Sequence, residues 1–170
     1  MKSSTIIAGS PSKLATPTDL GEKAREAVTL ALNPIVADAF ALFVKTKNYH
    51  WHMSGPHYND YHTMLDQQSD QILSMIDILA ERVRKLGGTT IRSIGQIKSL
   101  QHVRDDDEAF VSAKEMIRRL MDENKDFVKR MRDAHKVCSE NNDVASASEL
   151  ENFIDQTERR TWFLFELQAE

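Results

Sequence analysis

The 170-residue chain has one cysteine, four prolines and six glycines, and each shortage excludes a class of structure. The single cysteine, Cys138, has no partner for an internal disulfide, which excludes a disulfide-stabilised scaffold and favours a reducing compartment. The low glycine and proline content excludes collagen-like and low-complexity chains. No secretory signal is recognised, because the apolar stretch 5–8 is too short for one. We therefore expect a cytoplasmic protein.

Long hydrophobic runs and basic charge are also scarce. We find no apolar run near the roughly 20 residues that a membrane span requires, so we expect no membrane association. Lysine and arginine number 22 against 26 acidic residues, and the net charge of -4 argues against nucleic-acid binding through general basicity. What remains is an ordinary globular composition, with 41% hydrophobic residues in a chain long enough to bury a core.

The apolar pattern divides the chain into an arm and a helical domain. Residues 1–18 are rich in serine, threonine and proline without an apolar period, which predicts a mobile arm before a single domain over 19–170. The capping-box pair Asp19 and Glu22 predicts the start of a first helix that runs to about residue 53. Pro34 inside it marks either a kink, which we favour, or a break.

Three further long helices follow from the same periodicity. The second is expected over 59–86 with a glycine stop at 87–88, and the third is expected from a cap at 105–107 to about residue 141. Asp143 opens the fourth, whose apolar positions include Trp162 and Phe165. A longer connection with a short helical turn at 94–100 separates the second and third helices. We predict an all-α fold, a ferritin-like four-helix bundle with a short extra helix in the second-to-third connection.

The second helix carries an acidic stripe besides its apolar one. Its core positions follow a four-three spacing: Leu65, Ser69, Ile72, Ile76, Leu79, Val83 and Leu86. On a helical wheel, a second stripe lies about 110° to 120° away from this core face. That stripe consists of His62, Asp66, Asp70, Asp77 and Glu81. Acidic residues at helical spacing are most often a solvated face, and on composition alone this interpretation applies to Asp70 and to any one carboxylate of the stripe.

The remaining four residues of the stripe can ligate metal only if two chains meet. Asp66 and Asp77 are eleven residues apart, about 16 Å along a helix, so one ion cannot contact both ends. An antiparallel pair of these helices about a two-fold axis near residues 71–72 would join His62 and Asp66 of one chain to Asp77 and Glu81 of the other. Such mixed nitrogen and oxygen ligation suits iron better than structural zinc or calcium.

Other candidates lie near this stripe or on the remaining helices. His50, at the end of the first helix, could add a second imidazole to the cluster. Trp51 is by itself more often a core or interface residue than a redox participant. The other histidines are expected on the surface or in loops: His52, His57, His102 and His135.

Three blocks between Asn48 and Gly88 closely resemble the Dps family of mini-ferritins: N-Y-H-W-H-x-x-G, H-x-x-x-D and D-x-x-A-E-R-x-x-x-L-G-G. The resemblance implies a dodecameric homo-oligomer, a hollow shell with metal sites across two-fold interfaces. It also implies a ferroxidase that oxidises iron, Fe(II) to Fe(III), and stores the ferric mineral inside. The family prefers hydrogen peroxide as the oxidant, and for this chain the oxidant is hydrogen peroxide or O2. Such a protein is cytoplasmic, at times in the nucleoid, and protects the cell and its DNA from oxidative damage.

The resemblance also assigns roles to single residues. It implies two ions per site, one bound by His50 with Asp77 and Glu81 of the mate, and a second, often weaker, bound by His62 and Asp66. It places Trp51 beside the site, where it can take up oxidising equivalents.

The sequence departs from the family pattern at two places. Family members commonly place an aspartate at a pore position where this chain has Ser148, so that Asp143, Glu149 or Glu151 would have to replace it. The arm has only Lys2 and Lys13, which argues against direct DNA binding. A nucleoid-compacting DNA-binding protein with incidental metal binding stays the alternative. An intrasubunit di-iron enzyme is disfavoured, because no histidine follows a glutamate by three residues.

Overall fold

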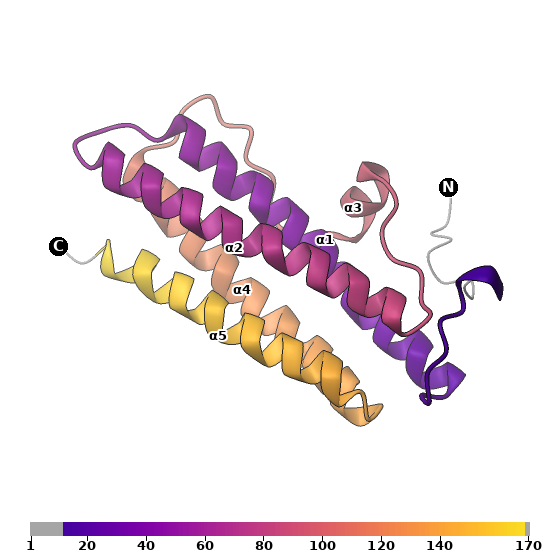
Figure 1. The fold of residues 1–170 in the computed structure, drawn as a ribbon. Coiled ribbons are helices and arrows are strands. Elements are labelled where there is room, and N and C mark those ends of the chain that lie inside the picture. The colour runs from indigo at the N-terminus through magenta and orange to yellow at the C-terminus, as the bar shows by residue number, and fades with distance from the viewer. Residues whose placement is uncertain (1–11, 169–170) are drawn as a thin grey trace.

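The computed structural model describes residues 12–168, and within them it contains α-helices and one short 3-10 helix but no strand (Figure 1). The 3-10 helix is Ser12–Leu14. The α-helices are α1 (Glu22–His52), α2 (Tyr58–Lys85), α3 (Ile94–Leu100), α4 (Ala113–Glu140) and α5 (Val144–Glu166). The predicted all-α class and the short helix in the second-to-third connection are confirmed.

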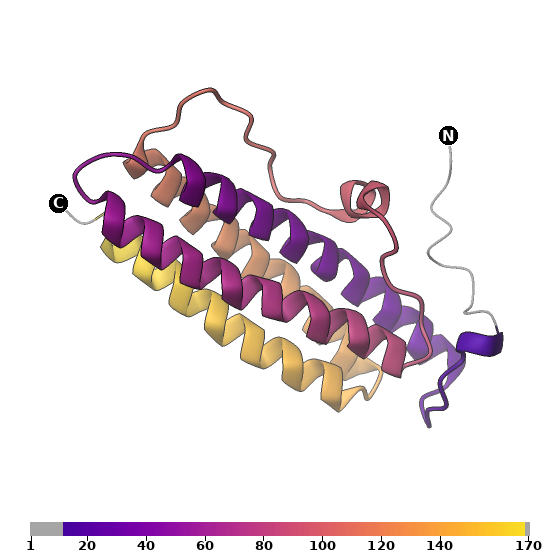
Figure 2. The same ribbon diagram turned by 45° about the horizontal axis from the view of Figure 1, so that its top comes forward.

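The four long helices form a bundle of two antiparallel pairs, α1 with α2 and α4 with α5 (Figures 1 and 2). The connection between α2 and α4 runs back along the length of the bundle, and its helix α3 packs against α1. This crossover makes α2 and α4 parallel, as the ferritin-like topology requires. The short turn between α1 and α2 brings the last turn of α1 beside the first turns of α2.

The apolar stripes bury as their spacing predicts. Every predicted core residue of α2 is buried, from Leu65 to Leu86. On α4 the buried positions recur at the same spacing and end at the free thiol of Cys138. On α5 the expectation was wrong at the end of the helix, because Trp162 and Phe165 are each 57% exposed. These two aromatic side chains lie on the outer face of α5, whereas Leu164 between them is fully buried in the core.

Two of the three predicted N-terminal helix caps were wrong. α1 begins at Glu22 after Gly21 without a side-chain cap, and the Thr18 hydroxyl, not Asp19, accepts a local bond from the Leu20 amide at 3.3 Å. α4 begins at residue 113 because the Ser112 hydroxyl accepts from the Glu115 amide at 3.3 Å, well after the aspartates at 105–107. Asp143 caps α5 as predicted, accepting from the Ser146 amide at 3.1 Å.

The helix stops follow the glycine signal. Gly87 has φ +74°, and a Cβ there would lie 3.0 Å from the Thr16 carbonyl oxygen, so that both conformation and space favour glycine. Residues 12–18, part of the predicted arm, pass close to this end of α2, where Arg84 Nη2 donates to the Leu14 carbonyl at 2.9 Å. The rest of the predicted arm, residues 1–11, lies outside the described residues.

Pro34 does not break α1, which is one continuous helix through this position. Contrary to the sequence expectation, α1 also contains an 18-residue window apolar and uncharged enough to cross a membrane. Of that window, 56% is buried inside the bundle, as in the core helix of a globular protein, which passes the same test.

Candidate metal centre

Two histidines from neighbouring helices bind each other's backbone where α1 ends and α2 begins. His50 Nδ1 lies 2.8 Å from the His62 carbonyl oxygen, and His62 Nδ1 lies 2.9 Å from the His50 carbonyl oxygen. The two rings stack with their centroids 3.7 Å apart. His50 is buried and His62 is half-buried, so both imidazoles are held in place by the α1–α2 contact.

This reciprocal arrangement selects one tautomer of each ring. A carbonyl oxygen can only accept a hydrogen bond, so each Nδ1 must carry the proton. In the neutral ring the lone pair then lies on Nε2, the atom left free to bind a metal ion. Metal-binding histidines are commonly oriented in this way by a carbonyl that accepts from the other ring nitrogen.

Asp66 lies one turn after His62 on α2 and completes the cluster. Its Oδ1 is 3.8 Å from His50 Nε2 and accepts a hydrogen bond from Lys47 Nζ. The Lys47 ammonium, helped by the two imidazoles, holds the pKa of the Asp66 carboxyl below its ordinary value. The carboxylate therefore stays ionised at neutral pH, as a metal ligand must be.

The other two predicted ligands lie on the second half of the same helix and are exposed. Within residues 12–168, the only polar contact of Glu81 is with Lys85 at 3.5 Å, between side chains that are 61% and 60% exposed. Asp77 is exposed and makes no ion pair or hydrogen bond with any residue of 12–168. Both carboxylates are thus available to a partner from outside the chain.

The chain brings together three of the five predicted ligands, His50, His62 and Asp66, and leaves Asp77 and Glu81 apart from them. Helical geometry separates Asp66 from Asp77 by about 16 Å. Among residues 12–168, no three histidine, cysteine or acidic side chains gather closely enough to hold a metal ion by themselves. One chain alone therefore presents half of a ligand set.

Lys47 was missed by the sequence reasoning. Its position three residues before His50 places both side chains on the same face of α1, and this spacing was the one available signal. That the ammonium meets Asp66 depends on how α1 packs on α2, which no local pattern reports.

Aromatic and histidine side chains around the cluster differ in exposure. Trp51 is 64% exposed in the single chain, so it does not fill the core of its own bundle. Its neighbour Tyr49 is buried and donates to Asp106, which Arg119 also contacts at 2.9 Å. Burial and the Asp106 carboxylate raise the pKa of the Tyr49 phenol far above its ordinary value.

The four histidines expected on the surface or in loops stay outside the cluster. His52 and His57 are exposed, and the His102 side chain is 58% exposed. His135 is half-buried on α4, where Nε2 lies 2.8 Å from Glu151 of α5.

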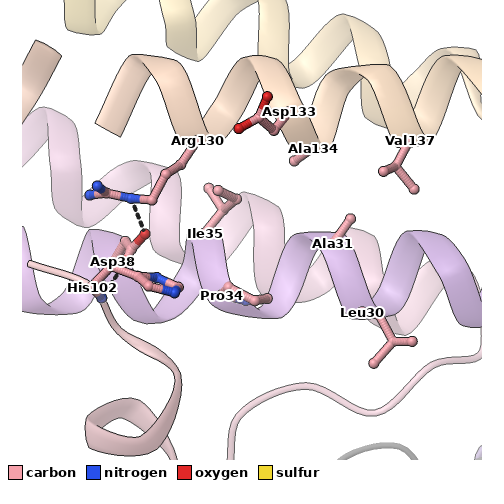
Figure 3. A pocket seen from close by; sticks show the side chains of 10 residues that line it. All are labelled: Leu30, Ala31, Pro34, Ile35, Asp38, His102, Arg130, Asp133, Ala134 and Val137. Carbon is pink, nitrogen blue, oxygen red and sulfur yellow. Dashed lines mark hydrogen bonds and ion pairs between the residues drawn. The ribbon is translucent and has the colours of Figure 1, made fainter. Parts of the chain in front are cut away.

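A cavity of about 290 Å³ lies between α1 and α4, away from the predicted ligands (Figure 3). At one end of it the fully buried Asp38 accepts from Arg130 Nε at 2.6 Å and from the His102 amide at 2.6 Å. Because both oxygens of the buried Asp38 carboxylate accept these bonds, Asp38 ties α4 and the crossover to α1 and has a structural role.

Comparisons with known proteins agree with the four-helix fold described above. Residues 29–169 match the family model described as a ferritin-like domain. An uncharacterized low temperature-induced protein from Nostoc is 30% identical over 85% of this chain and 82% of its own length. The "DNA protection during starvation protein" of Brevibacillus brevis is 29% identical over 82% of this chain and 93% of its own length.

Solved structures agree. A Dps protein from Bacillus brevis superposes with a TM-score of 0.84 at 27% identity, over 88% of this chain and 100% of that one. DpsC from Streptomyces coelicolor gives a TM-score of 0.88 at 26% identity, over 91% of both chains. The chain belongs to the Dps family of ferritin-like proteins.

The interior of this Dps-family bundle does not favour a metal site, because it already contains a buried cation. Arg160 is fully buried there, donating from Nε to Asn124 Oδ1 at 3.0 Å and from Nη2 to the Thr157 hydroxyl at 2.7 Å. Burial lowers its pKa to about 10, so the guanidinium is still charged at neutral pH. A cation at this position would repel a second one, which disfavours an intrasubunit di-iron site.

The structure also narrows the replacements for the aspartate that the family places at the position of Ser148. Asp143 is 2% exposed and is held by Arg82 Nη2 at 2.7 Å, so it cannot line a pore. Ser148 itself is exposed, and Glu151 is exposed beside His135. Glu149 and Glu151 remain as candidates for the role.

Proposed function

We propose that this Dps-family protein oxidises Fe(II) at sites shared between two chains and stores the ferric product inside an oligomeric shell. The observation that carries the proposal is the half-built ligand set: His50, His62 and Asp66 are oriented by their own chain, while Asp77 and Glu81 are exposed and unused. A second α2 packed antiparallel would supply the missing carboxylates to each half-site. Iron is the substrate of this reaction.

The ligand chemistry supports Fe(II) as the ion bound. Two imidazole nitrogens and three carboxylates form the mixed set that first-row redox metals accept, and no thiolate is nearby. Anionic ligands favour Fe(III) over Fe(II), so binding promotes the loss of an electron. Two ions in one site can give both electrons to a single peroxide.

The proposed reaction with peroxide balances without a radical. Two Fe(II), one H2O2 and two protons give two Fe(III) and two water molecules, as the O–O bond receives one electron from each ion. Because both electrons leave together, no hydroxyl radical is released. Removal of iron and peroxide in this way would protect DNA, which agrees with the name carried by the Brevibacillus relative.

Mixing two inactive variants tests whether the site is shared. One variant carries His62→Ala and Asp66→Ala, and the other carries Asp77→Ala and Glu81→Ala. Each alone should lose at least about 100-fold in the initial rate of Fe(II) oxidation by peroxide. If the chains are unfolded together and reassembled at equal amounts, half of the two-fold pairs are hybrids with one intact site.

The mixture should therefore recover roughly a quarter of the wild-type rate. Asp70→Ala, an exposed change on the same helix, serves as the matched control and should keep the full rate. A mixture as inactive as its two parents would contradict a site shared between chains. Equal rates for all variants would exclude these residues altogether.

A gel-shift assay distinguishes the proposed iron oxidation from the alternative function, compaction of DNA by direct binding. Binding through basic side chains weakens steeply with salt, so retardation at low salt that disappears at moderate salt would favour it. With a net charge of -4, we expect no retardation at moderate salt.

A further inference from the structure

Lys47 competes with metal for one of the candidate ligands. Its ammonium donates to Asp66 Oδ1, the same oxygen that lies 3.8 Å from His50 Nε2. A metal ion bound by Asp66 beside the imidazoles would need this oxygen or a position next to it. The metal-free site therefore already holds a cation of the protein's own.

A second lysine, at the other end of α2, provides a comparison. Lys85 lies 3.5 Å from Glu81, but both side chains are more than half exposed, at 60% and 61%. In the Lys47 pair the lysine side chain is only 18% exposed, and the Asp66 side chain is 50% exposed. Exposed pairs are screened by water and contribute little, whereas a pair with one partly buried member attracts more strongly. The Lys47 pair should thus resist displacement and the Lys85 pair should not.

We propose that Lys47 sets the iron threshold of the site, because the second ferrous ion binds only by displacing its ammonium from Asp66. This inference rests on the proposed function and concerns the regulation of the same site. The first ion binds through His50 and the mate's carboxylates without competition. Oxidation that needs two ions then starts only when Fe(II) is high enough to remove Lys47 from Asp66.

Lys47 contributes no ligand in this scheme. It lies on α1 three residues before His50, its side chain is mostly shielded from solvent, and it acts by its charge alone. Replacement by a neutral side chain of similar length keeps the packing and removes the competition. Structural damage would weaken metal binding, so tighter binding in such a variant is a result that a purely structural role cannot give.

Calorimetric titration of the assembled protein with Co²⁺, without oxidant, measures both affinities. We expect the wild type to bind one ion per site tightly and a second at least about tenfold more weakly. In Lys47→Met the second ion should bind about tenfold more tightly than in the wild type. Lys47→Arg keeps the charge and should keep the weak second step.

Lys85→Met is the matched control, since it removes a lysine next to another candidate ligand, and both affinities should stay within about twofold of the wild type. Assembled mass and helix content are measured for each variant, and Lys47→Gln is read in the same way if the methionine variant does not assemble. An unchanged second affinity in Lys47→Met would overturn this inference and leave the proposed function intact. Absence of any Co²⁺ binding in the wild type would overturn both.

Discussion

The two halves of α2 carry the same kinds of ligand in opposite states. In the first half, His62 and Asp66 are held by His50 and Lys47 of α1. In the second half, and among residues 12–168, Asp77 is exposed without a partner and Glu81 contacts only an exposed lysine. The periodicity of α2 is the same in both halves, so the difference comes from what packs against each.

The chain therefore fixes the orientation of His62 and Asp66 by its own contacts, whereas it leaves Asp77 and Glu81 exposed for a second chain. The first half lies beside the last turn of α1, whose backbone carbonyl fixes the His62 ring. The second half lies beside an apolar surface on which Leu73 is 47% exposed and Ile78 is 37% exposed. Exposed apolar side chains next to exposed carboxylates are typical of a surface that another chain covers.

The largest effect is expected from blocking this second surface. Ile78→Glu places a charge among the exposed apolar residues of α2 and should prevent pairing of the chains. Without a mate, every site lacks its carboxylates, so Fe(II) oxidation should fall at least about 100-fold. Because Ile78 is partly exposed in the single chain, helix content should be unchanged. Light scattering and circular dichroism measure these two properties.

If Ile78→Glu kept both its assembled mass and its oxidation rate, the second half of α2 would not be the surface that pairs with another chain. Ser74→Ala, a neutral change on the same exposed part of α2, provides the control and should assemble like the wild type.

A smaller effect is expected on the stability of the single chain. In the unassembled Ile78→Glu background, His62→Ala should lower the free energy of unfolding by about 1 kcal/mol, because it removes a hydrogen bond and a ring contact between α1 and α2. Asp77→Ala in the same background should change it by less than about 0.5 kcal/mol. Urea unfolding measures both values. Equal costs would mean that the second half is also anchored by its own chain.

The smallest effect concerns the pH dependence that Asp66 causes. The hydrogen bond from Lys47 lowers the pKa of Asp66 below its ordinary value in the folded chain, so the unfolded chain binds the proton first as pH falls. The contribution of the pair to stability is therefore complete above the unfolded value and is lost as pH falls through the folded one. In that pH range, the metal-free wild type should lose its higher free energy of unfolding relative to Asp66→Asn. Urea unfolding between pH 6 and about pH 2.5 measures this difference.

For the fold, the periodicity of apolar residues predicted correctly those features that depend only on which face of a helix is buried. The stripes of α2 and α4 bury as expected, and α3 has the predicted bounds at 94–100. The predicted caps of α1 and α4 were wrong because several capping residues are adjacent and tertiary contacts choose among them. Asp106 shows this choice, since it binds Tyr49 and Arg119 and is not free to cap a helix.

For the candidate site, spacing predicted which residue types share a face but not which would touch. The helical wheel placed the acidic stripe away from the core, and the exposure of Asp70, Asp77 and Glu81 agrees with it. Nothing local predicted Lys47 on Asp66 or the guanidinium of Arg160 inside the bundle. Both depend on contacts between residues 19 or more positions apart in the chain.

The sequence by itself determined the helices, the faces that they bury and the 16 Å that separates the two ligand pairs, since a period of 3.6 residues and a rise of about 1.5 Å per residue hold in any context. The tertiary structure decided which nitrogen of each histidine is free and which carboxylate a lysine occupies. Those properties depend on the packing of α1 against α2, because hydrogen bonds require atoms to meet within about 3 Å and no periodicity specifies that meeting.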